Sequence, residues 1–175
     1  MYKVGKVIDS EVLEEMVEDC LSGTRHTQPS KVSKTGEFKG HYNEVRTSKN
    51  FFVHHHMYPE FCEQMEDWVG DGTKVNQIDI LLYEKGDKFD CHMDDSEDVG
   101  TRGNRHWSTS TILHLSEDFV GDGLRIYTDT STGDYIVPRQ EVGDTVIFKS
   151  KQVPHEAAPV ERGTRIVAVA WLDFK

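Results

Sequence analysis

The sequence is poor in cysteine and contains no long apolar run. Its three cysteines, Cys20, Cys62 and Cys91, lie far apart and form no Cys-x-x-Cys pair, which argues against a disulfide framework or a structural zinc site. We expect three reduced and mostly buried thiols. No apolar stretch approaches the ~20 residues of a membrane helix, and the N-terminus lacks the apolar segment of a signal peptide. These absences predict a cytoplasmic protein without a membrane partner.

Positive charge is also scarce, because 20 lysines and arginines stand against 31 aspartates and glutamates. The net charge of −11 repels phosphate backbones, so we expect no nucleic-acid partner. A length of 175 residues suits one domain with a substantial core. We expect this domain to span residues 1–175, with a helical N-terminal support over residues 1–74 and a β core over residues 75–175.

Two helices are predicted in the first part of the chain. Apolar residues recur every three to four positions over residues 10–22, which predicts an amphipathic helix capped by Asp9 or Ser10. A second helix is predicted to begin near Pro59, since proline is favoured in the first helical turn. The polar residues 24–42 predict a loop or a weak hairpin.

Short β-rich runs follow from residue 75 onward, separated by turns that contain glycine and aspartate. Many short strands with regular turn signals predict an antiparallel sandwich or jelly roll, with the two helices packed on the outside of one sheet. The predicted fold class is therefore mainly β with flanking helices. The predicted strands are Ile78–Tyr83, Thr109–Leu115, Leu124–Tyr127, Thr145–Phe148 and Arg165–Leu172.

Two histidines and an aspartate form the sharpest local pattern. His92 and Asp94 stand at positions i and i+2, so on a strand their side chains point to the same face. His155 comes much later, where a neighbouring strand can bring it to the same point. Two histidines and one carboxylate form the facial triad of non-haem iron(II) oxygenases. This triad leaves room on the metal for a bidentate 2-oxo acid and for dioxygen.

Arg165 begins the apolar run Ile166–Leu172. A guanidinium in such a run is costly to bury without a partner. A dicarboxylate whose far end pairs with Arg165 removes that cost. We therefore expect a dicarboxylic 2-oxo acid as cosubstrate, held between iron(II) and Arg165.

The segments around these residues resemble the 2-oxoglutarate/iron(II) dioxygenase superfamily and, within it, prolyl 4-hydroxylase catalytic domains. Residues 82–94, together with Leu81 before them, are similar to the family segment L-x-Y-x-x-G-x-x-[FY]-x-x-H-x-D. The family's C-terminal block is matched by Gly143–Phe148, His155–Val160, Gly163–Arg165 and Trp171, and the R-[TS]-S element of prolyl hydroxylases by Arg46-Thr47-Ser48.

The resemblance implies a double-stranded β-helix core and assigns roles to further residues. Tyr83 and His114 would join Arg165 at the cosubstrate, and Arg46, Ser48 and Trp171 would contact the substrate. The implied cofactors are iron(II), 2-oxoglutarate and dioxygen, with ascorbate as a candidate reductant. Relatives often carry tyrosine where this chain has His114. The sequence also departs from the family pattern at Gly121-Asp122-Gly123-Leu124, where Gly-Gly-Glu is common, and at Arg105, which is shifted.

The favoured interpretation is an oxygenase that hydroxylates an unactivated C–H bond of a peptidyl proline, in a peptide or protein, with release of succinate and carbon dioxide. Hydroxylation of a free amino acid or another small molecule is the alternative. A non-catalytic β-barrel binding module would not need the intact triad. A zinc hydrolase would have no use for Arg165 in its pocket, and an Alk-type demethylase would carry a second arginine in the last strand.

Two other features are given no part in the site. Neighbouring residues on a strand point to alternate faces, so His54-His55-His56 cannot chelate one metal together, and we expect a solvated or partly packed segment. Glu156 follows a candidate ligand directly and is expected to point away from it.

Overall fold

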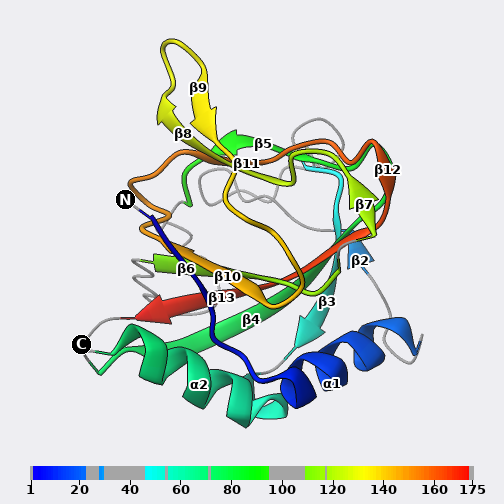
Figure 1. Cartoon of the computed structure of the whole chain (residues 1–175), viewed down its shortest axis with the longest axis vertical. Helices are drawn as coiled ribbons and strands as arrows, with labels where there is room; N and C mark the ends of the chain where they lie inside the picture. Colours follow the sequence, from blue (N-terminus) through cyan, green and yellow to red (C-terminus); the bar gives the residue numbers. More distant parts are fainter. Residues whose placement is uncertain are drawn as a thin grey trace.

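The computed structural model describes residues 2–22, 28–29, 46–53, 55–70, 72–94, 109–116 and 118–173. Two antiparallel sheets face each other, and two helices cover the outer face of the larger sheet (Figure 1). This arrangement confirms the prediction of a mainly β jelly roll with helices packed on one sheet. The stretch 24–42, predicted as a loop or weak hairpin, lies outside the described residues except for the short strand β2 (Gln28–Pro29).

The larger sheet is built around strand β13, which pairs with both β4 and β6. Because both faces of β13 are covered, its sequence is apolar almost throughout instead of alternating. Its even-numbered residues Ile166 to Leu172 pack toward the helices, whereas Val167 and Val169 face the space between the sheets. The strands in spatial order are β1 (Tyr2–Lys6), β10 (Asp144–Phe148), β6 (Thr109–His114), β13 (Arg165–Asp173), β4 (Lys74–Tyr83), β3 (Lys49–Val53) and β2.

The smaller sheet has strand β11 between β5 and β8. This central position sets His155 of β11 opposite His92 of β5 on one side and opposite Ile126 of β8 on the other. The hairpin of β8 and β9 projects beyond the body of the molecule (Figure 1). The strands are β5 (Phe89–His92), β11 (His155–Ala157), β8 (Leu124–Asp129) and β9 (Asp134–Ile136), and a separate pair is formed by β7 (Phe119–Val120) and β12 (Arg162–Gly163).

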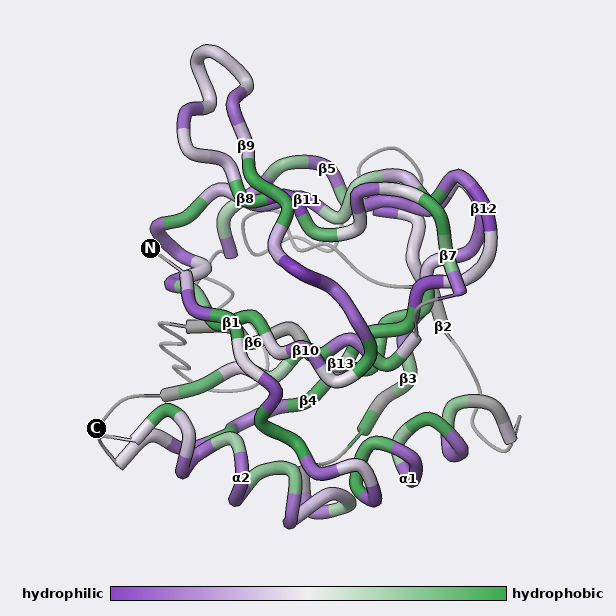
Figure 2. Tube along the Cα trace, viewed as in Figure 1, coloured by the Kyte–Doolittle hydropathy of each residue, from purple (hydrophilic) through white to green (hydrophobic). Residues whose placement is uncertain are grey.

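Helices α1 (Ser10–Leu21) and α2 (Pro59–Val69) bury one apolar stripe each against the larger sheet, with Met16, Phe61 and Met65 fully buried. Figure 2 shows hydrophilic residues on the side of α2 that faces away from the sheet. None of the helices in the described part of the chain is long and apolar enough to cross a membrane.

The start of α1 differs from the prediction. Asp9 stands at the cap position, but its side chain makes no capping hydrogen bond to the helix. Instead, the Asp9 carboxylate accepts a hydrogen bond from Nε2 of Gln64 at 2.9 Å, and the Asp9 backbone N–H donates to Oε1 of Gln64 at 2.9 Å. This exchange ties the start of α1 to α2.

Several elements were not foreseen. Strands β1 and β3 belong to the larger sheet, although they lie in the stretch predicted as helical support. Strand β4 begins at Lys74, four residues before the predicted Ile78.

The cysteine expectation is only partly right. Cys20 is buried and Cys62 half-buried, but Cys91 is exposed because it points away from the face of β5 that carries His92. In the histidine run, residues His55–Met57 form a 3-10 turn, η1, with His56 exposed. His54 and Arg105 lie outside the described residues.

Candidate active site

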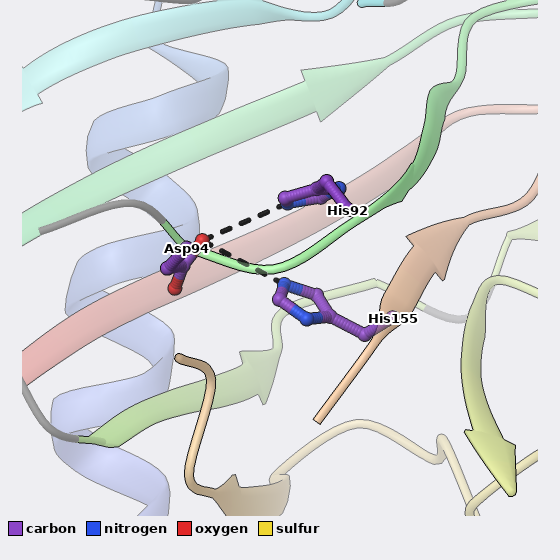
Figure 3. A group of neighbouring side chains, drawn as sticks. All are labelled: His92, Asp94 and His155. Carbon is purple, nitrogen blue, oxygen red and sulfur yellow. Dashed lines mark ion pairs between the residues drawn. The ribbon is translucent and has the colours of Figure 1, made fainter. Parts of the chain in front are cut away.

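The side chains of His92, Asp94 and His155 converge between the two sheets (Figure 3). His92 comes from β5, Asp94 from the residues just after it, and His155 from the neighbouring strand β11. The backbone N–H of Asp94 donates to the carbonyl of Ser150 at 3.0 Å, which holds the backbone that carries the carboxylate. One ligand atom from each of the three side chains lies within 4.8 Å of the others.

Backbone carbonyls orient both imidazoles. Nδ1 of His92 lies 2.7 Å from the Asp90 carbonyl, and Nδ1 of His155 lies 3.0 Å from the Val153 carbonyl. A carbonyl only accepts, so each Nδ1 carries the proton and each Nε2 presents a lone pair. Burial first, and then the nearby His92, lower the pKa of His155 to about 4, so this ring is neutral at physiological pH.

The three ligand atoms face one another without a hydrogen bond between them. Oδ1 of Asp94 lies 3.6 Å from Nε2 of His92 and 3.7 Å from Nε2 of His155, which is beyond hydrogen-bond range. A carboxylate oxygen and two imidazole lone pairs aimed at one point are a suitable donor set for a divalent metal. The residues therefore fit the iron(II) that the sequence predicts.

Aromatic rings pack against both histidines, a contact that the sequence did not predict. Phe89 stacks on His92 with ring centroids 3.6 Å apart, and Phe148 meets His155 edge-on at 4.8 Å. The two imidazoles are themselves 4.3 Å apart. The aromatic position three residues before His92 was visible in the motif, but only the folded register shows that its ring contacts the imidazole.

Arg165 lies at the start of β13, opposite Tyr83 of β4. Only 2% of its surface is exposed, and its Nε and Nη2 have no hydrogen-bond partner among the described residues. Its guanidinium lies 5.3 Å from the ring centroid of Tyr83 and 6.0 Å from that of Phe119. Burial lowers the pKa of Arg165 to about 10, which still leaves it cationic at neutral pH. An unpaired, buried cation of this kind suits an anionic ligand group.

One pocket contains both the His/Asp/His cluster and Arg165. The wall between them is mostly apolar, which excludes water from the space that joins the two polar ends. Tyr83, Arg46 and Trp171, all predicted as site residues, also line this pocket. The apolar lining residues are Leu81, Phe89, Leu124, Phe148, Ala157, Val167 and Val169.

His114 is fully buried on β6, opposite Val167, and both its ring nitrogens lack hydrogen-bond partners among the described residues. Burial and, to a lesser degree, the charge of Arg165 lower the pKa of His114 well below its usual value. A neutral imidazole therefore lies near the guanidinium without lining the pocket itself.

Arg46, which lines the pocket, contacts Ser48 and Phe89. Nε of Arg46 donates to Oγ of Ser48 at 3.1 Å, and the Arg46 guanidinium lies 4.7 Å from the ring centroid of Phe89. Ser48 is almost fully buried.

Glu156 accepts hydrogen bonds from Tyr127 and Arg125 on the outer face of the smaller sheet, away from the site.

Two antiparallel sheets that enclose a His/Asp/His cluster define the class of double-stranded β-helix oxygenases. The family model described as the 2OG-Fe(II) oxygenase superfamily matches residues 78–173, more than half of the chain. The chain belongs to this superfamily. Both the family and the fold predicted from the sequence are thereby confirmed.

Individual relatives agree with this assignment. A PKHD-type hydroxylase of Maricaulis maris (strain MCS10) is 29% identical over 98 residues, which cover 56% of this chain and 42% of that relative. This chain thus spans less than half the length of the curated relative. A Pseudomonas putida prolyl-4-hydroxylase has the same fold, with a TM-score of 0.70 and 16% identity over 99% of this chain and 92% of that one. A Trichoplax adhaerens prolyl hydroxylase, solved with a hypoxia inducible factor peptide fragment, gives a TM-score of 0.69 and 10% identity over 98% and 83%.

Proposed function

We propose that this chain is an iron(II)- and 2-oxoglutarate-dependent oxygenase that hydroxylates an unactivated C–H bond. The observation that carries the proposal is one apolar pocket with a metal-ligand cluster at one place and an unpaired, buried guanidinium at another. A five-carbon dicarboxylic 2-oxo acid offers two anionic ends of the kind these two features require.

His92, Asp94 and His155 would hold the iron. When bound, iron and 2-oxoglutarate supply the oxidising chemistry, in which dioxygen is consumed and succinate and carbon dioxide are released. Arg165 would bind the distal carboxylate of the cosubstrate, with Tyr83 beside it and the neutral imidazole of His114 near the guanidinium. Ascorbate is a suitable reductant for assays of this protein.

The chain's own residues prepare this chemistry in three ways. The carbonyls of Asp90 and Val153 hold the imidazoles in the tautomer that presents Nε2. The apolar wall keeps water away from the reacting centre and strengthens the charge pairing at Arg165. No general base is required, which agrees with the position of Glu156 on the outer face.

For the substrate, we propose a proline in a peptide or protein. Arg46 and Trp171 line the pocket, where a guanidinium can donate to peptide carbonyls and an indole can pack on a pyrrolidine ring. Ser48 is buried, and its Oγ accepts a hydrogen bond from Nε of Arg46. Ser48 would therefore act indirectly, by holding the Arg46 side chain in position. The two solved structures with a similar fold described above are both prolyl hydroxylases, which supports a proline substrate. A free amino acid or another small molecule is the second candidate.

The test is incubation of the iron(II)-loaded protein with 2-oxoglutarate, ascorbate and a panel of proline-rich peptides and free amino acids. We expect one peptide to gain the mass of one oxygen atom, with succinate formed in equal amount. Asp94→Ala serves as the matched control and should form no product. A protein that binds 2-oxoglutarate but oxidises only a free amino acid would transfer the assignment to the second candidate; one that binds no 2-oxoglutarate would contradict the oxygenase proposal.

A further inference from the structure

The guanidinium of Arg165 is backed by a tight turn. Gly123 in this turn has a φ of +67°, which favours glycine. A Cβ at this position would lie 3.2 Å from Nε of Arg165 and 2.3 Å from Oε1 of Gln140. The missing side chain of Gly123 therefore leaves the space in which the Gln140 amide lies close to the guanidinium.

Gln140 holds this turn with both ends of its amide. Its Oε1 accepts a hydrogen bond from the backbone N–H of Leu124 at 2.7 Å, and its Nε2 donates to the backbone carbonyl of Asp122. The carbonyl of Gly123 in turn accepts from the backbone N–H of Ala158 at 2.7 Å. The backbone behind Arg165 is thus fixed from two sides.

The loop that supplies Gln140 is itself anchored. Arg139 makes a bidentate pair with the fully buried Asp144 at 2.8 and 2.7 Å, and the backbone N–H of Glu141 donates to the same carboxylate at 2.9 Å. The N–H of Gly143 donates to the carbonyl of His114 at 2.9 Å. A side chain supported on both sides in this way has a defined position.

We propose that Gln140 is a positioning residue for Arg165 and that its neutral amide makes the pocket selective for dicarboxylic 2-oxo acids. This inference rests on the proposed function and deepens it. The amide keeps the turn against the guanidinium but adds no charge. Arg165 therefore stays unneutralised and available to the distal carboxylate of a ligand. A glutamate at position 140 would place an anion beside Arg165, and the ligand would have to displace it.

The test compares Gln140→Glu and Gln140→Ala with the unchanged chain. Each iron(II)-loaded protein is titrated without oxygen with 2-oxoglutarate and with pyruvate, which has the same 2-oxo acid end but no distal carboxylate. Binding is followed by the visible absorption band of the chelated oxo acid. Gln140→Glu should weaken 2-oxoglutarate binding by about tenfold or more, because two carboxylates then compete for one guanidinium. Gln140→Ala should weaken it less, and neither variant should change pyruvate binding by more than about twofold.

Two further variants separate positioning from general damage. Glu141→Gln removes a charge from the same loop, but its side chain is 61% exposed, so 2-oxoglutarate binding should stay unchanged. Gly123→Ala should push the Gln140 amide out of place and weaken 2-oxoglutarate binding. In the double variant Gly123→Ala/Gln140→Ala the new Cβ has no amide to displace, although its contact with Nε of Arg165 and the backbone strain remain. The loss in the double variant should therefore be smaller than the sum of the two single losses.

The outcomes are distinguishable. If the unchanged chain binds no 2-oxoglutarate, the proposed function itself fails. If it does bind and Gln140→Glu binds equally well, or loses pyruvate in the same proportion, the positioning role is overturned. Should Gln140→Glu fail to fold, as judged by circular dichroism, Gln140→Ala and the Gly123→Ala pair decide by the same ratio of the two ligands.

Discussion

The imidazole of His92 lies nearly flat against the phenyl ring of Phe89, with centroids 3.6 Å apart and planes 21° apart. The guanidinium of Arg46 lies over the same phenyl ring, 4.7 Å from its centroid. Phe89 therefore contacts both a candidate metal ligand and a candidate substrate-binding residue. The orientation of the ligand and the pocket wall depend on one aromatic side chain.

Replacement of Phe89 by leucine should weaken iron(II) binding. Leucine keeps the apolar bulk but offers no flat face, so the His92 ring gains freedom to turn away from Asp94. Loss of a group that orients a metal ligand costs about 10- to 100-fold in metal affinity, and we expect the lower end of this range. The measurement is an anaerobic metal titration. Phe119→Leu is the control, because the Phe119 ring lies near Arg165, with its centroid 6.0 Å from the guanidinium, and contacts no candidate metal ligand among the contacts described above. Equal metal affinities in the two variants would contradict the role of Phe89.

Arg46→Ala should weaken peptide-dependent turnover but spare the slow decay of 2-oxoglutarate that occurs without substrate. Loss of hydrogen bonds from a charged donor should raise the KM for the peptide by about tenfold or more. Lys49→Ala, which removes an exposed cation paired with Glu84, is the matched control and should have no such effect. If both reactions of Arg46→Ala fall together, Arg46 acts through Phe89 on the metal site and not on the substrate.

The sequence predicted that His92, Asp94 and His155 lie together, because side chains at positions i and i+2 of a strand point to the same face. The prediction holds although Asp94 lies just after the end of β5. It did not predict the contact between Phe89 and His92, because this depends on an irregular register between β5 and β11. Gln140 was missed for a similar reason. Its amide reaches a turn formed by residues much earlier in the chain, and no local pattern records that contact.

The fold was predictable where burial leaves a long apolar run, as in β13. It was not predictable for β1, a short strand at the edge of the sheet whose residues are mostly exposed or half-buried. Such a strand is held by backbone pairing with β10, to which side-chain periodicity contributes little. The predicted cap of α1 was wrong for a similar reason, because the Asp9 side chain is hydrogen-bonded to Gln64 of α2, which is distant in the sequence.

Arg165→Ala should raise the dissociation constant for 2-oxoglutarate by at least about a hundredfold, because losing one partner of a buried charge pair costs roughly 3–5 kcal/mol. Iron(II) affinity should remain nearly the same, since the guanidinium is not among the metal-ligand atoms. Arg165→Lys keeps the charge but not the bidentate geometry and should give an intermediate value. The dissociation constant for 2-oxoglutarate is measured by anaerobic titration of the iron(II)-loaded protein, and the iron(II) affinity by a separate anaerobic metal titration. An unchanged requirement for 2-oxoglutarate would place its distal carboxylate elsewhere.

The stability of the metal-free protein should fall as the pH is lowered, and His114 should contribute to that fall. Its ring is fully buried, and the pKa is lowered well below 6.5 by burial and then by Arg165. The unfolded chain takes up a proton near pH 6.5, whereas the folded chain resists protonation until the pH reaches the lowered pKa. The contribution of His114 is therefore fully present above pH 6.5 and is lost as the pH falls below that value.

His114→Leu should remove about 1 kcal/mol of the stability lost between pH 6.5 and pH 5.5, a difference that approaches about 1.4 kcal/mol per pH unit at lower pH, because leucine has no proton to bind. His155, with a pKa of about 4, adds a slope of the same sign but is present in both proteins, so it cancels in the comparison. The measurement is urea unfolding at a series of pH values in the presence of a chelator. His56→Gln, which replaces an exposed imidazole, should leave the slope unchanged. If the free energy of unfolding depends on pH in the same way in the unchanged chain and in His114→Leu, the His114 ring takes up a proton equally well in the folded and unfolded states. That result would contradict the lowered pKa of a fully buried imidazole near Arg165.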